Sequence, residues 1–133
     1  MNLNMYRRLS QEWAKHIEKG ISSPQVIILD LLNAKGKLKA SDLAEALNIT
    51  SGAVTGLCDK LIQYGYAKRS RTEEDRRVVY LEITDDGRDM LKNVAEKRKR
   101  ITEKFYGRLP EDDLRHLIRI HRQVLQNIEL EKE

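Results

Sequence analysis

The chain has 133 residues, of which 25 are basic and 21 acidic, giving a formal net charge of +4 that permits a polyanionic partner without requiring one. This length suits one domain and excludes two catalytic lobes, while 40% hydrophobic residues supply a core and the 7 glycines and 2 prolines argue against disorder. No apolar run approaches the roughly 18 residues of a membrane span and the first ten residues lack a signal-peptide stretch, so we expect a cytoplasmic protein without a membrane partner.

Two helices are predicted in the first quarter of the chain. The first is amphipathic and ends at Gly20, and its apolar positions are Tyr6, Leu9, Trp13 and Ile17. The second begins with a capping box formed by Ser22 and Gln25, continues through an apolar run at 26–32 and closes near Gly36. The apolar run predicts that this second helix is buried.

A pair of short helices follows, joined by a tight turn. The first covers residues 42–47, where Ser41 can provide the N-cap and Asn48 breaks the helical pattern. The second covers residues 50–64, starting at either of its first two residues. Its inward face carries Val54, Leu57, Cys58 and Leu61, and its outward face carries Gly52, Thr55, Gly56, Asp59 and Gln63.

The periodicity then changes to that of strands. Residues 66–70 and 78–83 are predicted to form a hairpin around a charged loop at 71–77. Helical spacing returns at residue 84 or 85 in a long helix, and again after Pro110 in a last helix. The apolar positions of these two helices are Met90, Leu91, Val94, Ile101 and Phe105, and then Leu114, Leu117, Ile118, His121, Val124, Leu125 and Ile128.

Two short helices followed at once by a hairpin form a winged helix-turn-helix, so the predicted fold class is mainly α with a small β-hairpin wing. We expect the second helix of the pair to enter the major groove of DNA. Each glycine inside this helix costs about 1 kcal/mol relative to alanine. Either a closely approaching DNA backbone or base edge explains the glycines, or the fold merely tolerates them. The loop arginines likewise either reach phosphates and a narrow minor groove or are ordinary solvated charge.

Several spaced motifs occur between residues 53 and 87. They are Asp59, Lys60 and Leu61 in the helix, Gly65 beyond it, the wing triplet Asp75, Arg76 and Arg77, and the strand exit from Leu81 to Gly87. This pattern closely resembles the core of the MarR family of transcriptional regulators. The resemblance implies a dimeric winged helix that represses or activates genes in response to small molecules or oxidants. We expect one domain, 1–133, with a DNA-binding module at 22–84 flanked by N- and C-terminal dimerisation helices at 1–20 and 85–133.

The resemblance also implies roles for individual residues. Arg77 matches the wing arginine that enters the minor groove, Asp75 is expected to orient the loop by pairing with an arginine, and Arg76 is expected to contact a phosphate. Gly56 stands where relatives often have a larger polar or basic residue, so we expect part of the specificity to come from wing insertion and DNA shape. The predicted DNA-binding residues are Lys39, Ser41, Thr50, Ser51, Gly52, Thr55, Arg71, Asp75, Arg76 and Arg77.

A two-fold dimer would place two recognition helices about one DNA turn apart, roughly 34 to 36 Å, whereas one helix-turn-helix covers too little DNA for tight specific binding. The apolar stripes of the first and last helices lie outside the winged-helix core in sequence. We favour their pairing between protomers as a homodimer, although they could instead complete an intramolecular core. The basic run 97–100 spans a full helical turn and is expected to be mostly a solvated face.

The expected function is therefore a repressor that binds a pseudo-palindromic operator in double-stranded DNA and is relieved by a small-molecule or stress signal. The resemblance implies an effector pocket, which Trp13 and His16 would line. The alternative is a winged-helix protein-interaction module without direct DNA binding. The sequence has no nucleophile motif, phosphate loop or clustered acid-base set, so an enzyme is not expected.

The cysteine and histidine content predicts neither a redox sensor nor a metal site. Cys58 is the single cysteine, and it lies on the apolar face of the recognition helix, where a small thiol most often just packs. The three histidines are His16, His116 and His121. They have neither the i, i+4 spacing of paired metal ligands nor cysteines beside them that could complete a metal site. We therefore expect no metal and no cofactor.

Overall fold

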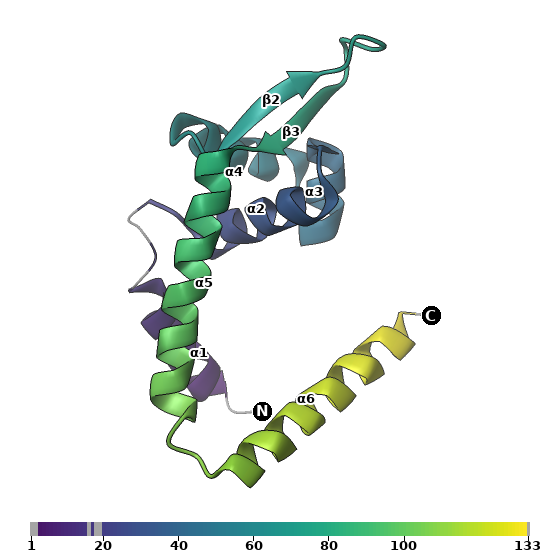
Figure 1. The fold of residues 1–133 in the computed structure, drawn as a ribbon. Helices are drawn as coiled ribbons and strands as arrows, with labels where there is room; N and C mark the ends of the chain where they lie inside the picture. Colours follow the sequence, from purple (N-terminus) through teal and green to yellow (C-terminus); the bar gives the residue numbers. More distant parts are fainter. Residues whose placement is uncertain (1–2, 16, 18–19, 133) are drawn as a thin grey trace. The chain divides into compact units, whose positions relative to one another are not determined.

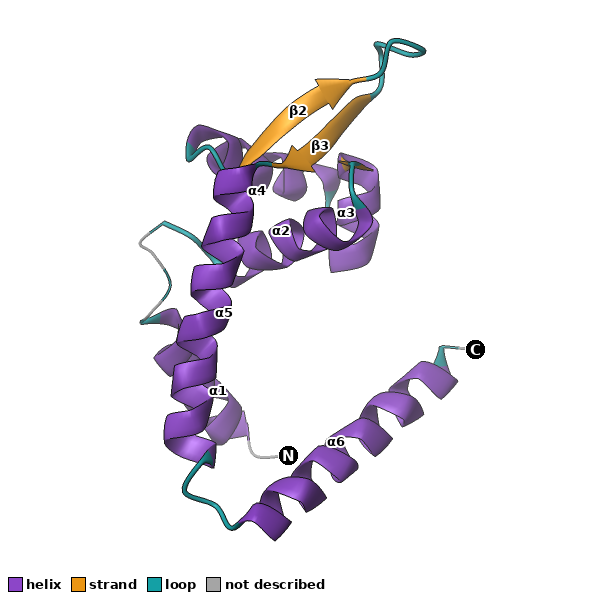
Figure 2. Cartoon of the chain, in the orientation of Figure 1, coloured by secondary structure: helices purple, strands orange, loops and turns teal. Residues whose placement is uncertain are grey.

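A computed structural model describes residues 3–15, 17 and 20–132. It divides into two compact units, Met1–Arg98 and Lys99–Glu133, and each is described by itself. Figures 1 and 2 show the helices, which are α1 (Leu3–Ala14), α2 (Ser23–Lys35), α3 (Ala40–Leu47), α4 (Ser51–Gln63), α5 (Asp85–Tyr106) and α6 (Glu111–Glu131). Over the described ranges, none of these helices combines the length and apolar character needed to cross a membrane.

Three short strands form an antiparallel sheet in the order β1, β3, β2. The predicted hairpin is present as β2 (Ala67–Arg71) and β3 (Val79–Ile83), and it projects from the helices with its loop at the far end (Figure 1). β1 (Leu38–Lys39) pairs with the other edge of β3, opposite Leu81 and Tyr80. The predicted fold class, mainly α with a small β-hairpin wing, is confirmed, with the addition of β1.

The core lies where the apolar faces of α2, α3 and α4 meet β3 and the first half of α5. Its most deeply buried apolar side chains are Val26, Ile28, Leu29, Leu32, Leu43, Val54, Cys58 and Leu61. Fully burying one aliphatic side chain of this size contributes about 1.5 to 3 kcal/mol. This packing fixes the inward face of α4, and so determines which residues of α4 face solvent.

Gln25 is a buried polar residue of this core. Its Oε1 accepts a hydrogen bond from the backbone amide of Ser22 at 2.8 Å, which confirms the predicted capping box at the start of α2. Its Nε2 donates to the backbone carbonyl of Leu57 at 3.3 Å. The same side chain therefore caps α2 and ties it to α4.

Local chemistry sets the two ends of the turn between α3 and α4. Asn48 follows α3 with left-handed dihedrals, φ 55° and ψ 46°, as the predicted break requires. Thr50 precedes α4, and its hydroxyl oxygen accepts a hydrogen bond from the amide of Ala53 at 3.1 Å. The predicted start of α4 is confirmed.

Two predicted helix ends were wrong. Ser41 is not the N-cap of α3, because β1 leads directly into a helix that begins at Ala40, and the amide of Lys39 donates to the Asp42 carboxylate at 3.0 Å. The first helix ends at Ala14 rather than at Gly20. Beyond it, the amide of Ile17 bonds to the carbonyl of Ala14, three residues back at 3.4 Å, so the α-helical pattern has already stopped.

The start of α5 packs closely against the short segment that follows α4. The Thr84 hydroxyl donates to the carbonyl of Gly65 at 2.6 Å and accepts from the amide of Gly87 at 3.1 Å. Gly87 is buried, and a Cβ placed there would overlap the carbonyl oxygen of Tyr66 and lie 2.7 Å from Cγ1 of Ile83. Glycine is required at this position by the close approach of two backbones.

The apolar face of α5 was predicted largely correctly. Met90, Leu91, Val94 and Ile101 are buried, whereas Phe105 is exposed. In the basic run, Lys97, Lys99 and Arg100 are exposed as expected, but Arg98 is half-buried. Arg98 follows Leu91 and Val94 by seven and four residues, and this spacing places it on the buried face.

Candidate nucleic-acid interface

The outward face of α4 carries little side-chain volume at its N-terminal half. Gly52, Thr55 and Gly56 are exposed. Apart from its chain neighbours and the backbone of its own helix, a Cβ placed at either glycine would meet no described atom within 4 Å, and neither glycine has a positive φ. Neither packing within the described chain nor backbone geometry therefore requires glycine at these two positions, in contrast to Gly87.

The hydroxyl groups at the head of α4 are partly engaged by the helix itself. Thr50 Oγ1 accepts from the amide of Ala53, and Thr55 Oγ1 donates to the carbonyl of Ser51 at 3.0 Å. A hydroxyl has one donor and two acceptor positions. Thr50 therefore keeps its proton for an external acceptor, and Thr55 keeps acceptor positions for an external donor.

Polar contacts within the wing loop hold its tip. The Asp75 amide donates to the Thr72 hydroxyl at 3.2 Å, and Asp75 Oδ1 accepts from the backbone amide of Arg77 at 3.0 Å and from its Nε at 3.3 Å. Arg71 Nη1 donates to the carbonyl of Arg76 at 3.1 Å. The expected pairing of Asp75 with an arginine is present, and its partner Arg77 still has 94% of its side chain exposed. An arginine in this state is oriented and available to an external anion.

The predicted DNA-binding residues lie on three segments of the first compact unit. Lys39 and Ser41 are exposed where β1 meets α3, the second group is at the head of α4, and the third is on the wing. All of them are exposed except Asp75, which is half-buried. The exposed members of the second and third groups are Thr50, Ser51, Gly52, Thr55, Arg71, Arg76 and Arg77.

An ion pair that the sequence did not reveal joins α4 to the wing strand β2. Arg69 Nη2 on β2 donates to Asp59 Oδ1 on α4. The two residues are ten positions apart, on elements with different periodicities, so no spacing rule pairs them. Only the packing of the hairpin against α4 brings them together.

Cys58 is buried in the core, as predicted for a packing thiol. Burial raises the pKa of its thiol to about 11, with smaller opposing contributions from the charges of Arg69 and Asp59. A thiolate at neutral pH is therefore strongly disfavoured, which argues against an oxidant-sensing role. Within the described ranges, no group of three or more histidine, cysteine, aspartate or glutamate residues could hold a metal ion.

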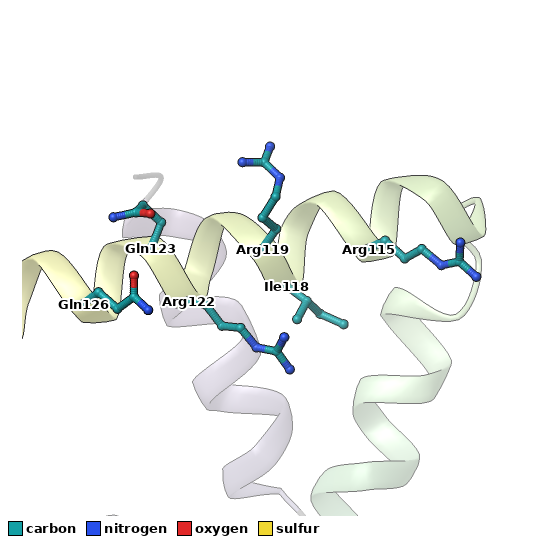
Figure 3. A pocket seen from close by; sticks show the side chains of 6 residues that line it. All are labelled: Arg115, Ile118, Arg119, Arg122, Gln123 and Gln126. Carbon is teal, nitrogen blue, oxygen red and sulfur yellow. The ribbon is translucent and has the colours of Figure 1, made fainter.

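The residues expected to line an effector pocket are only partly described. His16 lies outside the described residues. The indole Nε1 of Trp13 is buried and has no hydrogen-bond partner within the described ranges. A separate hollow lies along α6 and is lined by Arg115, Ile118, Arg119, Arg122, Gln123 and Gln126 (Figure 3). Because all six belong to one helix, this hollow is a one-sided surface depression and does not form an enclosed ligand pocket.

The chain matches the MarR family model over residues 21–79. Its sequence is 29% identical over 129 residues to the "HTH-type transcriptional repressor MdtR" of Bacillus subtilis, covering 96% of this chain and 83% of MdtR. It is also 41% identical over 86 residues to an "Uncharacterized HTH-type transcriptional regulator YfiV" of the same organism, covering 65% of this chain and only 52% of YfiV. These two relatives are named as regulators and not as enzymes, in agreement with the prediction.

The fold is also found among solved structures. The crystal structure of the YusO protein of Bacillus subtilis aligns with a TM-score of 0.82 and 29% identity, covering 92% of this chain and 88% of YusO. This alignment extends well beyond the winged-helix module. The overall architecture, with helices on both sides of that module in sequence, is therefore shared with a known protein.

Proposed function

The chain belongs to the MarR family of transcriptional regulators, and from this premise we propose that it is a dimeric repressor that binds a pseudo-palindromic operator. In each protomer α4 enters the major groove, and the wing places Arg77 in the adjoining minor groove. One observation carries the proposal. The N-terminal half of α4, whose outward side chains are small, and a wing tip with an oriented arginine are both exposed in one compact unit. The name of MdtR as a repressor supports the direction of the regulation.

The remaining interface residues act mainly on the DNA backbone. Lys39, Ser41 and Arg76 contact phosphates, which position the protein without reading sequence. Arg71 has a second role, because its guanidinium also holds the Arg76 carbonyl at the wing tip. Since the outward face of α4 carries two glycines, shape readout by the wing supplies part of the specificity.

Dimerisation uses the apolar stripes of α1 and α6. Leu3, Met5 and Tyr6 of α1 are exposed, as are Ile118, Val124, Leu125 and Ile128 of α6. Apolar side chains in such stripes are buried favourably against a second copy. A small-molecule effector relieves repression. The indole Nε1 of Trp13, which has no hydrogen-bond partner among the described residues, supports a site for the effector that Trp13 and His16 line.

Replacing Arg77 by alanine should weaken binding to a cognate operator by about 1 to 3 kcal/mol, because it removes a guanidinium from the minor groove. The measurement is a titration of a duplex enriched by the wild-type chain from a random-sequence pool, repeated at several salt concentrations. The logarithm of the wild-type affinity should fall linearly with the logarithm of salt concentration.

Arg115→Ala is the matched control, because Arg115 is also exposed and paired with a carboxylate, that of Glu111 at 2.7 Å, but lies on α6. It should bind the enriched duplex like the wild type. If Arg77→Ala binds as tightly as this control, the wing has no part in recognition. If the wild-type chain enriches no sequence at low salt, the protein-interaction module becomes the better explanation.

Gly52→Ala and Gly56→Ala should each stabilise the folded chain by roughly 0.5 to 1 kcal/mol while weakening binding to the enriched duplex. The stabilisation is expected because alanine favours a helix and neither new methyl group meets a described atom outside its own helix. The loss of affinity is expected because the methyl groups separate α4 from the groove. Urea unfolding and duplex titration of the same variants measure the two effects. Tighter folding with unchanged DNA affinity would show that DNA does not approach these glycines.

A further inference from the structure

The ion pair between Asp59 and Arg69 has no role in the function described so far. Asp59 lies on the outward face of α4, one helical turn beyond Thr55, and Arg69 is the third residue of β2. Their side chains are 54% and 48% exposed, so both groups remain in contact with solvent. The pair thus links the recognition helix to the wing at the surface that the proposed function directs toward DNA.

A carboxylate is an unexpected group at this place. DNA phosphates repel a negative charge on a groove-facing surface, and that repulsion lowers affinity for any sequence. The guanidinium of Arg69 offsets the charge of Asp59. Two neutral side chains would give the same net charge as this ion pair. We therefore look for its effect in the position of β2 relative to α4, which the pair joins.

Beyond its first residue, β2 contributes no buried side chain that could set the direction of the hairpin. Ala67 is buried at the base of β2, but Lys68, Arg69 and Arg71 are exposed. Arg69 and Arg71 are two residues apart and therefore lie on the same face of the strand. Arg71 in turn holds the carbonyl of Arg76 at the tip. Polar contacts thus connect α4 to the base of the wing and the outer strand to its tip.

We propose that Asp59 and Arg69 are a positioning pair that fixes the direction of the wing relative to α4, so that α4 and Arg77 reach adjoining grooves together. This inference rests on the proposed DNA-binding function. Exposed ion pairs contribute little to folding stability, so loss of this pair should leave the fold intact. Its effect should appear instead as a loss of specific DNA affinity.

The sign of the effect of Asp59→Asn on DNA binding tests the proposal. Removing one negative charge should by itself raise affinity for all DNA. If the pair positions the wing, Asp59→Asn should instead lower affinity for the enriched duplex by roughly three- to tenfold. Its affinity for a scrambled duplex of the same composition should stay equal to that of the wild type or rise. Asp30→Asn, which removes an exposed carboxylate from α2, is the control for charge alone and should not lower either affinity.

A second measurement tests whether Asp59→Asn changes DNA affinity through the wing. In an Arg77→Ala background the wing arginine is absent, so adding Asp59→Asn should change affinity for the enriched duplex by less than about twofold. The melting temperature of Asp59→Asn should stay within about 3 °C of the wild-type value, as expected for an exposed pair.

Three results would overturn the positioning role. In the first, Asp59→Asn raises affinity for the enriched duplex. In the second, Asp59→Asn lowers that affinity by the same factor in the Arg77→Ala background as in the wild type. In the third, the melting temperature of Asp59→Asn falls by more than about 3 °C. In each case the proposed regulator function would stand, because the wild-type chain still enriches a sequence. Failure of the wild type to enrich any duplex would instead remove the proposed function itself.

Discussion

Leu125→Glu should convert the proposed dimer into a monomer and lower affinity for the enriched duplex by about 10²- to 10⁴-fold. Leu125 is 61% exposed in the described chain and follows Ile118 by seven residues, which places both on one stripe of α6. A charge buried in an apolar interface without a partner is strongly unfavourable. Loss of the dimer leaves each DNA-binding unit to bind alone. Linking two binding units raises affinity by about 10²- to 10⁴-fold, and this gain would be lost. Sedimentation at micromolar concentration measures the mass, and titration measures the affinity.

Leu130→Glu is the matched control for this change. It introduces the same side chain into the same helix at a residue that is 66% exposed. Five residues of helix separate the two positions, so their side chains point about 140° apart, and Leu130 lies off the stripe. Leu130→Glu should stay dimeric and bind DNA normally. If Leu125→Glu also sediments at twice the monomer mass, the stripe on α6 is not the interface.

Interactions between residues three or four positions apart made most of the fold predictable from the sequence. The capping box of Ser22 and Gln25, the cap at Thr50 and the left-handed Asn48 each depend on such neighbours. β1 was not predicted because two residues give no periodicity, and its pairing with β3 depends on tertiary structure. The cap of α3 was misplaced for the same reason, since β1 determines where that helix begins.

The candidate site was predictable as a set of residues but not as a set of contacts. Family resemblance identified Asp75 and Arg77, while the structure shows that Arg77 itself is the partner of Asp75. Arg71 was expected only to meet DNA, yet it also holds the wing tip through a carbonyl. These contacts depend on loop conformation, which residue spacing does not determine. The same limit applies to glycines in helices, where sequence alone does not distinguish Gly52 from Gly87.

Gly87→Ala should destabilise the folded chain by at least about 2 kcal/mol. Alanine gains roughly 1 kcal/mol from its helix preference, but the new methyl group would overlap the carbonyl oxygen of Tyr66 and crowd Ile83. Tyr66 contributes backbone atoms here, so rotating a side chain cannot relieve the overlap. Relief requires α5 to move away from the segment that Thr84 ties to Gly65 at 2.6 Å, and that movement would break buried packing. Urea unfolding measures the loss.

Gly52→Ala is the matched control for Gly87→Ala. Both substitutions add one methyl group to a helical glycine, and the helix preference of alanine is the same in each. The two positions differ in what surrounds the new atom, which is open space at Gly52 and the backbone of Tyr66 at Gly87. The two changes in unfolding free energy should therefore have opposite signs. Equal changes at both sites would mean that α5 does not contact the Tyr66 backbone in solution, and the joint between the recognition-helix segment and α5 would be looser than described.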